Sequence, residues 1–178
     1  MAGLDWPALE SLTTPLKTSF TSSSTKQPTN VQRIVSRDVI PSCLQAIEAL
    51  DAAALHRILW QASLRLSRQA LLDTLIIPLM RQVGQKWSEG SLRIMHEHLA
   101  SNVVHAHLCH MLDYSAPVSA ELPRILIAAP AGQWCYLGAL AVAVISQDHG
   151  WEPVFLGPNL PSEDIAAASA TLNPQLIA

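Results

Sequence analysis

Apolar residues are spaced in two different ways along the chain, and the change falls near Pro117. Between residues 39 and 114 they recur every three or four positions, which is the period of an amphipathic helix. After residue 123, short apolar runs alternate with helix-like segments, which is typical of parallel strands joined by helices. The pattern therefore predicts an α/β chain with a helical half followed by a β/α half.

The helical half is expected to contain four helices with short connections. They cover residues 39–50, 52–66, 68–89 and 92–114. Asp51 and Ser67 can cap the second and third helices, and Gly90 ends the third. Pro78 should kink the third helix, because a proline ring has no amide hydrogen to donate. Four helices joined in this way predict a compact N-terminal four-helix bundle.

The third and fourth helices each have one well-defined face. In the third, the apolar stripe consists of Leu72, Ile76, Leu79, Met80, Val83 and Trp87. In the fourth, approximately one face carries Ile94, His98, Ser101, His105 and Leu108. Trp87 and His98 are thus expected on either side of one short connection.

The second half of the chain predicts the order β-α-β-α-β. Strands are expected at residues 124–129, 152–157 and 175–178, and helices at residues 137–147 and 162–170. This order is the first half of a doubly wound parallel sheet, as in Rossmann-like and flavodoxin-like folds. Three strands make a small and exposed sheet, so we expect this half to be a truncated domain.

The predicted domain organisation has four segments. Residues 1–37 are a flexible tail, 38–116 a four-helix cap, 117–122 a linker and 123–178 a partial Rossmann-like domain. The tail is inferred from residues 11–30, which are rich in Ser, Thr and Pro and contain no acidic residue. An organelle transit peptide is the competing interpretation, although the first arginine of the chain is Arg33.

Charge and composition argue against two classes of partner. The formal net charge is −3, whereas nucleic-acid-binding domains are usually clearly basic. Charged residues interrupt the apolar positions of the helices, so no membrane span is expected. The lack of a secretory signal and three unpaired-looking cysteines, Cys43, Cys109 and Cys135, fit a reducing compartment. We therefore expect a cytoplasmic protein that binds neither nucleic acid nor membrane directly.

A tryptophan followed by nine residues and a Glu-His pair occurs at Trp87, Glu97 and His98. With this motif, residues 38–178 resemble the cobalamin-binding domain of the MerR-type light-responsive transcriptional regulators. In that family a four-helix bundle covers a corrinoid and a Rossmann-like domain binds its lower face. The resemblance implies adenosylcobalamin or another corrinoid as cofactor, with Trp87 over the upper axial group and Glu97 and His98 against an adenosyl group. The remaining residues of the predicted cofactor-binding set are Ile94, Ser101 and Gly138.

The loop expected to face the lower side of the corrinoid departs from the family. There the family has an acidic residue, a spacer, a histidine that ligates cobalt, two spacers and a glycine. This chain has Gln133-Trp134-Cys135-Tyr136-Leu137-Gly138, so Cys135 replaces the histidine and Gln133 replaces the acid. Three interpretations of Cys135 are open: a thiolate ligand to cobalt, a small buried residue, or a redox-active thiol.

The residues associated with light chemistry in the family also differ here. Members that use adenosylcobalamin as a photosensor often have a histidine directly after the signature tryptophan, and this chain has Ser88. A bis-histidine product from those two positions therefore cannot form, although His105, two turns beyond His98, could reach the upper face. The family's segments that hold the nucleotide tail would lie beyond Ala178.

The fourth predicted helix is rich in histidine, with His96, His98, His105, His107 and His110. His107 and His110 have the spacing of a helical metal pair, which Asp113 could complete, but a solvated polar face is the preferred interpretation. The sequence contains no Gly-rich phosphate loop, no Ser-His-Asp order and no catalytic acid/base pair. We therefore expect no enzymatic activity.

The sequence thus predicts a cobalamin-binding sensory or regulatory module that responds to light or to its ligand. No helix-turn-helix is visible in residues 1–37, so an effect on transcription would act through a regulatory protein partner, self-association or a missing segment. One alternative is a corrinoid carrier that passes methyl groups between methyltransferases. The other is a degenerate scaffold that keeps the fold and binds nothing.

Overall fold

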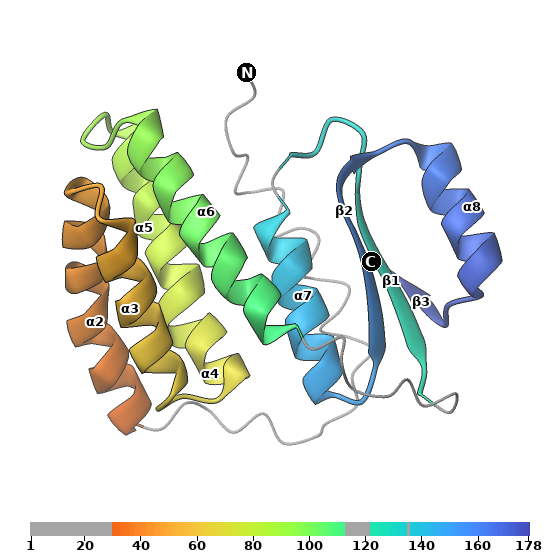
Figure 1. Ribbon diagram of the computed structural model, residues 1–178, viewed down its shortest axis with the longest axis horizontal. Coiled ribbons are helices and arrows are strands. Elements are labelled where there is room, and N and C mark those ends of the chain that lie inside the picture. The colour runs from red at the N-terminus through yellow and green to blue at the C-terminus, as the bar shows by residue number, and fades with distance from the viewer. Residues whose placement is uncertain (1–29, 113–121, 135) are drawn as a thin grey trace.

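The computed structural model describes residues 30–112, 122–134 and 136–178, with side chains from residue 39 onward. Figure 1 shows a helical half, a parallel sheet, one helix between the two and another helix on the far side of the sheet. The chain is thus rich in helix and has a small parallel sheet of three strands. The predicted tail up to residue 29, most of the predicted linker, Asp113 and Cys135 lie outside the described residues.

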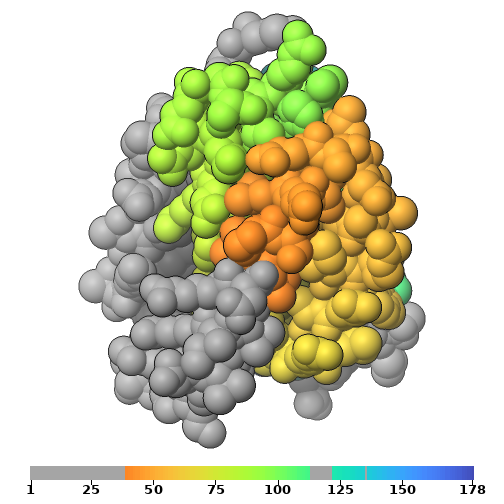
Figure 2. All heavy atoms as spheres, turned by 90° about the vertical axis from the view of Figure 1, so that its left-hand side faces the viewer, coloured from red at the N-terminus to blue at the C-terminus, as the bar shows by residue number. Residues whose placement is uncertain are grey.

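Helices make up most of the described residues up to residue 111. In chain order they are α2 (Asn30–Glu48), α3 (Ala52–Ser63), α4 (Arg68–Leu71), the π-helical turn η2 (Leu72–Ile76), α5 (Ile77–Ser88) and α6 (Ile94–Met111). On the outer face in Figure 2, α2 lies between α3 and the end of α5. None of the described helices has the length and apolar character of a membrane span.

Both predicted N-caps are confirmed. The Asp51 carboxylate accepts a hydrogen bond of 2.8 Å from the Ala54 amide. The Ser67 hydroxyl accepts one of 3.2 Å from the Ala70 amide. Each cap satisfies an amide that the first turn of a helix leaves without a partner, which fixes where α3 and α4 begin.

The first helix is longer than predicted. α2 begins at Asn30 rather than at residue 39, so residues 30–37 belong to a helix and not to a flexible tail. Val31, Ile34 and Val35 continue the helical spacing of apolar residues upstream, which is the physical reason for the extension. Pro41 then lies inside the helix, where it removes the hydrogen bond of its own amide without ending the helix.

The predicted third helix is irregular next to Pro78, but as a π-helical turn rather than a simple kink. The Ile77 amide donates to the Leu72 carbonyl, five residues earlier, which is the π-helical pattern. Pro78 follows at the start of α5 and has no amide hydrogen for the carbonyl four residues earlier. The predicted apolar stripe is buried from Leu72 to Val83, and Trp87 packs half-buried against the same core.

The β/α half forms one parallel sheet with the strand order β2-β1-β3. Its elements are β1 (Arg124–Pro130), α7 (Leu137–Asp148), β2 (Glu152–Leu160), α8 (Ser162–Leu172) and β3 (Leu176–Ile177). Arg124 and Glu152 lie opposite each other in the register of β1 with β2, and their side chains form an ion pair at 3.0 Å. In Figure 1, α7 covers the face of the sheet toward the helical half, and α8 covers the other face. The predicted order of strands and helices is confirmed.

Buried apolar residues join the two halves in one core. Leu108 of α6, Leu140 of α7 and Ile127 of β1 belong to the same cluster. α7 packs against α6 on one side and against β1 and β2 on the other. Because protein cores are close-packed, we expect a shift of α6 to be transmitted through α7 to the sheet.

Candidate functional site

Trp87 lies in the last turn of α5, just before the turn that leads to α6. Gly90 has a φ of +78°, and its amide donates to the Trp87 carbonyl over 3.0 Å. The Ser91 amide donates to the Lys86 carbonyl over 2.9 Å, and these two bonds together form a Schellman motif at the end of α5. The turn therefore fixes the position of the half-buried indole relative to the start of α6.

Glu97 and Ser101 form a polar pair one turn apart on α6. The Ser101 hydroxyl donates to Glu97 Oε1 over 2.6 Å, and Glu97 is only 9 % exposed. Glu97 lies in the first turn of α6, where the helix dipole stabilises a carboxylate. The carboxylate is thus held in place and still has lone pairs that can accept hydrogen bonds from a ligand.

The two histidines that flank Glu97 differ in their surroundings. His96 Nδ1 accepts a hydrogen bond of 2.9 Å from the Arg93 amide, so this side chain stabilises the start of α6. His98 is exposed. Its imidazole is therefore accessible to a ligand, whereas that of His96 has a structural role.

The face of α6 that carries His98 passes from solvent into the junction with α7. Along this face, Ile94 is 50 % exposed and His98 is exposed, Ser101 and His105 are half-buried, and Leu108 is buried. The exposure of these side chains therefore decreases from the start of α6 toward its junction with α7. A ligand can therefore approach the exposed end of this face, at Ile94 and His98, and extend toward its buried end at Leu108.

His105 marks the point where α6 meets the β/α half. Its ring lies edge-on to the ring of Tyr136, with 5.1 Å between the ring centroids. Tyr136 directly precedes α7, and the half-buried Gly138 lies in the first turn of that helix. The Tyr136 ring also lies 6.5 Å from the ring of Phe155 in β2. The start of α7 thus contacts the same face of α6 that carries His98.

The loop after β1 is braced by the end of β2. Asn159 Oδ1 accepts a hydrogen bond of 2.9 Å from the Gly132 amide, and the Asn159 amide donates to the Gln133 carbonyl over 3.1 Å. Asn159 has a φ of +59°, a conformation that asparagine adopts more readily than most residues. Parallel α/β folds bind ligands beyond the carboxyl ends of their strands, which is where this loop lies.

Asn159 was missed in the sequence, although an asparagine beside a proline in a strand pattern is a signal for left-handed backbone. In the same loop, Trp134 is 69 % exposed. Cys135 follows it and lies outside the described residues, so each interpretation of its thiol stays a prediction.

The predicted site residues therefore fall into two groups. The first group, at the α5–α6 turn, contains Trp87, Ile94, Glu97, His98 and Ser101. Gly138, at the start of α7, belongs to the second. The ring contact between His105 and Tyr136 connects the two groups.

The prediction of a solvated histidine face is wrong at His107. This residue is 1 % exposed, and neither of its ring nitrogens has a hydrogen-bond partner among the described residues. Its ring lies 6.4 Å from the rings of His56 and Trp60 in α3. Burial lowers the pKa of His107 to about 4, with a smaller effect from the nearby His56 and His110. The prediction failed because α3 covers this side of α6.

The described part of the chain contains no group of three or more His, Cys, Asp or Glu side chains that could hold a metal ion. Both described cysteines are free thiols, as predicted. Burial raises the pKa of the Cys43 thiol to about 12 and also raises the pKa of Cys109. Neither thiol therefore has the lowered pKa of a reactive cysteine.

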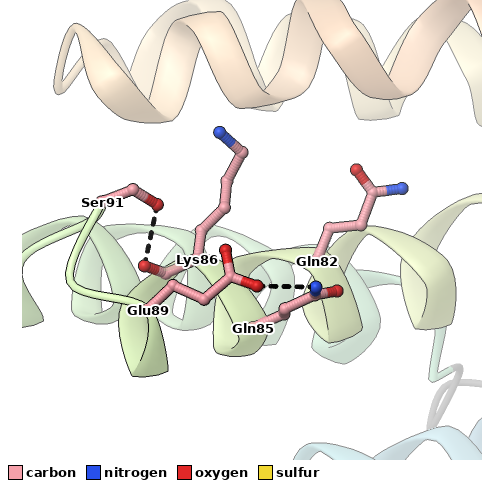
Figure 3. Close-up of a pocket in the computed structure, with 5 residues that line it drawn as sticks. All are labelled: Gln82, Gln85, Lys86, Glu89 and Ser91. Carbon is pink, nitrogen blue, oxygen red and sulfur yellow. Dashed lines mark hydrogen bonds between the residues drawn. The ribbon is translucent and has the colours of Figure 1, made fainter.

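A polar hollow of about 570 Å³ lies on the side of α5 that faces α2 (Figure 3). Its lining consists of Gln82, Gln85, Lys86, Glu89 and Ser91. Gln85 donates to Glu89 over 2.8 Å, and Lys86 Nζ lies 3.4 Å from Glu48 of α2. The residues that line this hollow include none of those predicted to bind the corrinoid.

Comparison with known proteins places residues 39–110 in the family model described as the B12 binding domain. Two curated relatives are HTH-type transcriptional repressors of Myxococcus xanthus. CarH is 29 % identical over 136 residues, which are 76 % of this chain and 45 % of the relative. CarA is 28 % identical over 133 residues, which are 75 % of this chain and 44 % of the relative. The chain thus spans less than half the length of the curated relatives it matches.

Two solved structures are also similar. One is a novel cobalamin-binding protein from Desulfitobacterium hafniense, with 19 % identity, a TM-score of 0.37 and coverage of 78 % of this chain and 66 % of that one. The other is the methanol:cobalamin methyltransferase complex MtaBC from Methanosarcina barkeri, with 15 % identity, a TM-score of 0.42 and coverage of 99 % and 69 %. Both TM-scores are below 0.5, so the sequence match is the stronger finding. Residues 39–110 therefore match a B12 binding domain, and about three quarters of the chain has weak similarity to the two repressors.

Proposed function

We propose that this protein is a regulatory module that binds a corrinoid between a four-helix cap and the partial Rossmann-like half. The observation that carries this proposal is the arrangement at the α5–α6 turn. There, Trp87 lies in the last turn of α5 and Glu97 and His98 lie at the start of α6, all within the segment that matches the B12 binding domain. The names of the two curated relatives, both transcriptional repressors, support a regulatory role.

The side chains at this face fit a corrinoid. The half-buried Trp87 offers a flat apolar surface, and the Glu97–Ser101 pair offers a charged acceptor beside a hydroxyl. The exposed His98 adds a donor and an acceptor. Adenosylcobalamin combines an apolar macrocycle with ribose hydroxyls and a base, so it is the corrinoid that would use all of these groups. When bound, it would supply a cobalt–carbon bond that light can break.

Each residue would have a separate role in binding. Glu97 would accept hydrogen bonds from the ribose hydroxyls. The hydrogen bond that Ser101 donates to Glu97 Oε1 would keep the carboxylate in its orientation. Trp87 would exclude water from the upper face of the ligand. Gly138, in the first turn of α7, would let the backbone of the β/α half approach the lower face.

Regulation would act through the junction of the two halves. α6 carries the candidate site at one end and packs against α7 at the other. A ligand that binds one arrangement of these helices more tightly than another increases the population of the first. The effect on transcription would then come from a further segment, a regulatory protein partner or self-association, and this chain itself would neither bind nucleic acid nor catalyse a reaction.

The test is to mix the purified protein with adenosylcobalamin in the dark, separate it by gel filtration and record the visible spectrum before and after illumination. Free cofactor, illuminated in parallel, is the control. We expect the corrinoid to elute with the protein, and light to change both the bound spectrum and the elution volume of the protein.

Three other outcomes distinguish the alternatives. Bound methylcobalamin that passes its methyl group to a methyltransferase partner would favour a methyl carrier. Elution of the protein without corrinoid would contradict the proposal and favour a scaffold that binds nothing. A Cys135→Ala variant with the same spectrum as the parent would show that sulfur does not ligate cobalt.

A further inference from the structure

His107 is a buried imidazole at the contact between α3 and α6. It is 1 % exposed, and neither of its ring nitrogens has a hydrogen-bond partner among the described residues. A polar group without a partner is costly in the interior, and a charged group is costlier still. The packing of the two helices therefore keeps His107 neutral, and its pKa is lowered to about 4 mainly by this burial.

Three imidazoles lie around the indole of Trp60 on α3. The rings of His56, His107 and His110 have their centroids 6.3, 6.4 and 5.0 Å from the Trp60 ring. Trp60 is 40 % exposed, and His56 and His110 are also exposed, so His107 is the one buried ring of these four. An exposed indole thus packs edge-on against a buried base.

The two helices offer no nearby negative charge to a protonated His107. α3 contains no Asp or Glu, and its titratable and charged side chains are His56 and Arg57. α6 adds His110 on this side, and its one acid, Glu97, lies ten residues earlier, about 15 Å along the helix. Positive charge on His56 or His110 opposes protonation of His107. The cluster is therefore stable only while His107 is neutral.

The other helices that pack against α6 do not supply the missing charge either. α5 contains no acid. The described acids at the ends of α2, α3 and α7 each have a partner of their own: Glu48 the Lys86 ammonium, Asp51 the Ala54 amide and Asp148 the Arg68 guanidinium. A proton on His107 is therefore stabilised only by water.

Two movements would bring water to His107. Separation of α3 from α6 would expose Leu55 and Leu59, which are fully buried, and would lose the free energy of burying both side chains. Rotation of the Trp60 side chain moves an indole that is already partly in solvent and leaves the backbone of α3 in place. The rotation is the smaller change.

We propose that Trp60 is a lid over His107 that acid opens. In the closed state the indole packs against the neutral imidazole, and in the open state it turns to solvent and water binds the protonated ring. A proton binds the open state more tightly than the closed one, so a fall in pH increases the population of the open state. Repulsion among the charges of the three histidines then opposes closure. This device does not depend on the proposed function.

The test is fluorine-19 NMR of the full chain labelled with 5-fluorotryptophan. The difference in chemical shift between H2O and D2O measures the exposure of each indole, and the Trp60 resonance is identified by its absence in Trp60→Phe. As the pH falls from 6.5 to 4, we expect this difference to rise on the order of twofold for Trp60, because the closed indole is 40 % exposed. Trp87 and Trp151 should keep their values at pH 7.

Two variants on α6 separate His107 from its neighbours. His107→Leu removes the buried base and leaves His56 and His110 in place, so Trp60 should keep its exposure at every pH. His110→Leu is the matched control, because it removes an imidazole that also contacts Trp60. It should still show the rise, at a higher pH than the parent, since one charge that opposes protonation of His107 is gone.

Removal of the lid is a second and independent measurement. In Trp60→Ala, water reaches His107 without any movement, so the pKa of His107, followed by NMR of labelled histidine, should rise from about 4 toward 6.5. An unchanged pKa in this variant would overturn the lid. So would a constant exposure of Trp60 down to pH 4, the same rise in His107→Leu as in the parent, or simultaneous exposure of Trp60, Trp87 and Trp151, which would mean that the whole protein unfolds.

Discussion

The candidate site contains both packed residues that hold its structure and an exposed residue that a ligand can reach. Trp87 packs against the core and Glu97 accepts a hydrogen bond from Ser101, whereas His98, the next residue along α6, is exposed. A binding face needs this combination, because ordered side chains keep their geometry before the ligand arrives. The burial of Glu97 is informative for the same reason, since a charged residue is seldom buried without a partner.

Glu97→Gln should weaken the binding of adenosylcobalamin. The substitution keeps the shape but removes the charge, and hydrogen bonds to charged groups contribute about 1.5–3 kcal/mol. We therefore expect the Kd, measured by titration calorimetry in the dark, to rise on the order of 10- to 100-fold. Glu89→Gln is the matched control, because Glu89 is an exposed glutamate at the end of α5 that pairs with Gln85. Equal affinities for the two variants would argue against a ribose contact at Glu97.

His107 should make the protein less stable in acid. Its pKa is about 4 in the folded protein, below the ordinary value of 6.5, so the unfolded chain takes up the proton first. The contribution of His107 to the free energy of unfolding is therefore fully present above pH 6.5. It is lost progressively as the pH falls from 6.5 to about 4.

His107→Leu should raise the free energy of unfolding at pH 7 and flatten its dependence on pH between 6.5 and 4. Leucine fills a similar volume and removes two buried nitrogens that have no partner among the described residues, which we expect to be worth about 1–3 kcal/mol. Urea denaturation at several pH values measures both effects. His98→Leu, at an exposed position of α6 outside this cluster, should keep the slope of the parent. A His107→Leu variant with the parent's slope would contradict this account.

At the scale of elements, the α5–α6 turn depends on the left-handed backbone conformation of one glycine. Gly90 adopts a φ of +78°, and the space where a Cβ would lie is open. A substitution there is therefore strained by the backbone alone and not by a clash with neighbours. The turn sets the position of Trp87, so this strain affects the candidate site as well as stability.

Gly90→Ala should lower the free energy of unfolding by about 1–2 kcal/mol, the cost of a left-handed conformation for an L-residue. Gly90→Asn should cost less, because asparagine tolerates this conformation. Urea denaturation of the two variants measures the difference. Equal losses for alanine and asparagine would mean that the Schellman geometry does not control the turn.

The helices and strands could be predicted because their apolar spacing and caps are local properties of the sequence. Asp51 and Ser67 cap as expected, and the β-α-β-α-β order is present. Pro78 predicts an irregular helix, but either a kink or a π-helical turn can accommodate its missing amide hydrogen. The choice depends on packing, which the local pattern does not contain.

The candidate site could be predicted only in part. The spacing of Trp87, Glu97 and His98 points to the α5–α6 turn, because only a short connection separates the two helices that carry them. The burial of His107 depends on α3, and the bracing of the β1 loop depends on Asn159, which is distant in sequence. Such contacts between separate elements are not visible in the spacing of residues along one helix or strand.

At the scale of the whole molecule, α7 is the link between the candidate site and the sheet. It packs against α6 on one side and against the sheet on the other, and its Leu140 is fully buried in the common core. Because the halves share this core, we expect them to unfold in one cooperative transition.

Leu140→Ala should destabilise both halves equally. A buried leucine replaced by alanine typically costs about 2–5 kcal/mol. We expect the slowest-exchanging amides of α5 and of β1 to lose the same amount of protection in native-state hydrogen exchange. Leu156→Ala, at an exposed position of β2, is the control and should change neither. A loss confined to β1 would mean that the two halves unfold separately.

The central claim is that the face at the α5–α6 turn binds a corrinoid, and the most direct test compares two tryptophans. Trp87 lies at the candidate site, whereas Trp60 lies on α3 beside His110. After gel filtration in the dark with adenosylcobalamin, we expect equimolar cobalt in the parent and in Trp60→Ala, and a strong loss of cobalt in Trp87→Ala. Equal cobalt in Trp87→Ala and Trp60→Ala, or no cobalt in the parent, would contradict the claim.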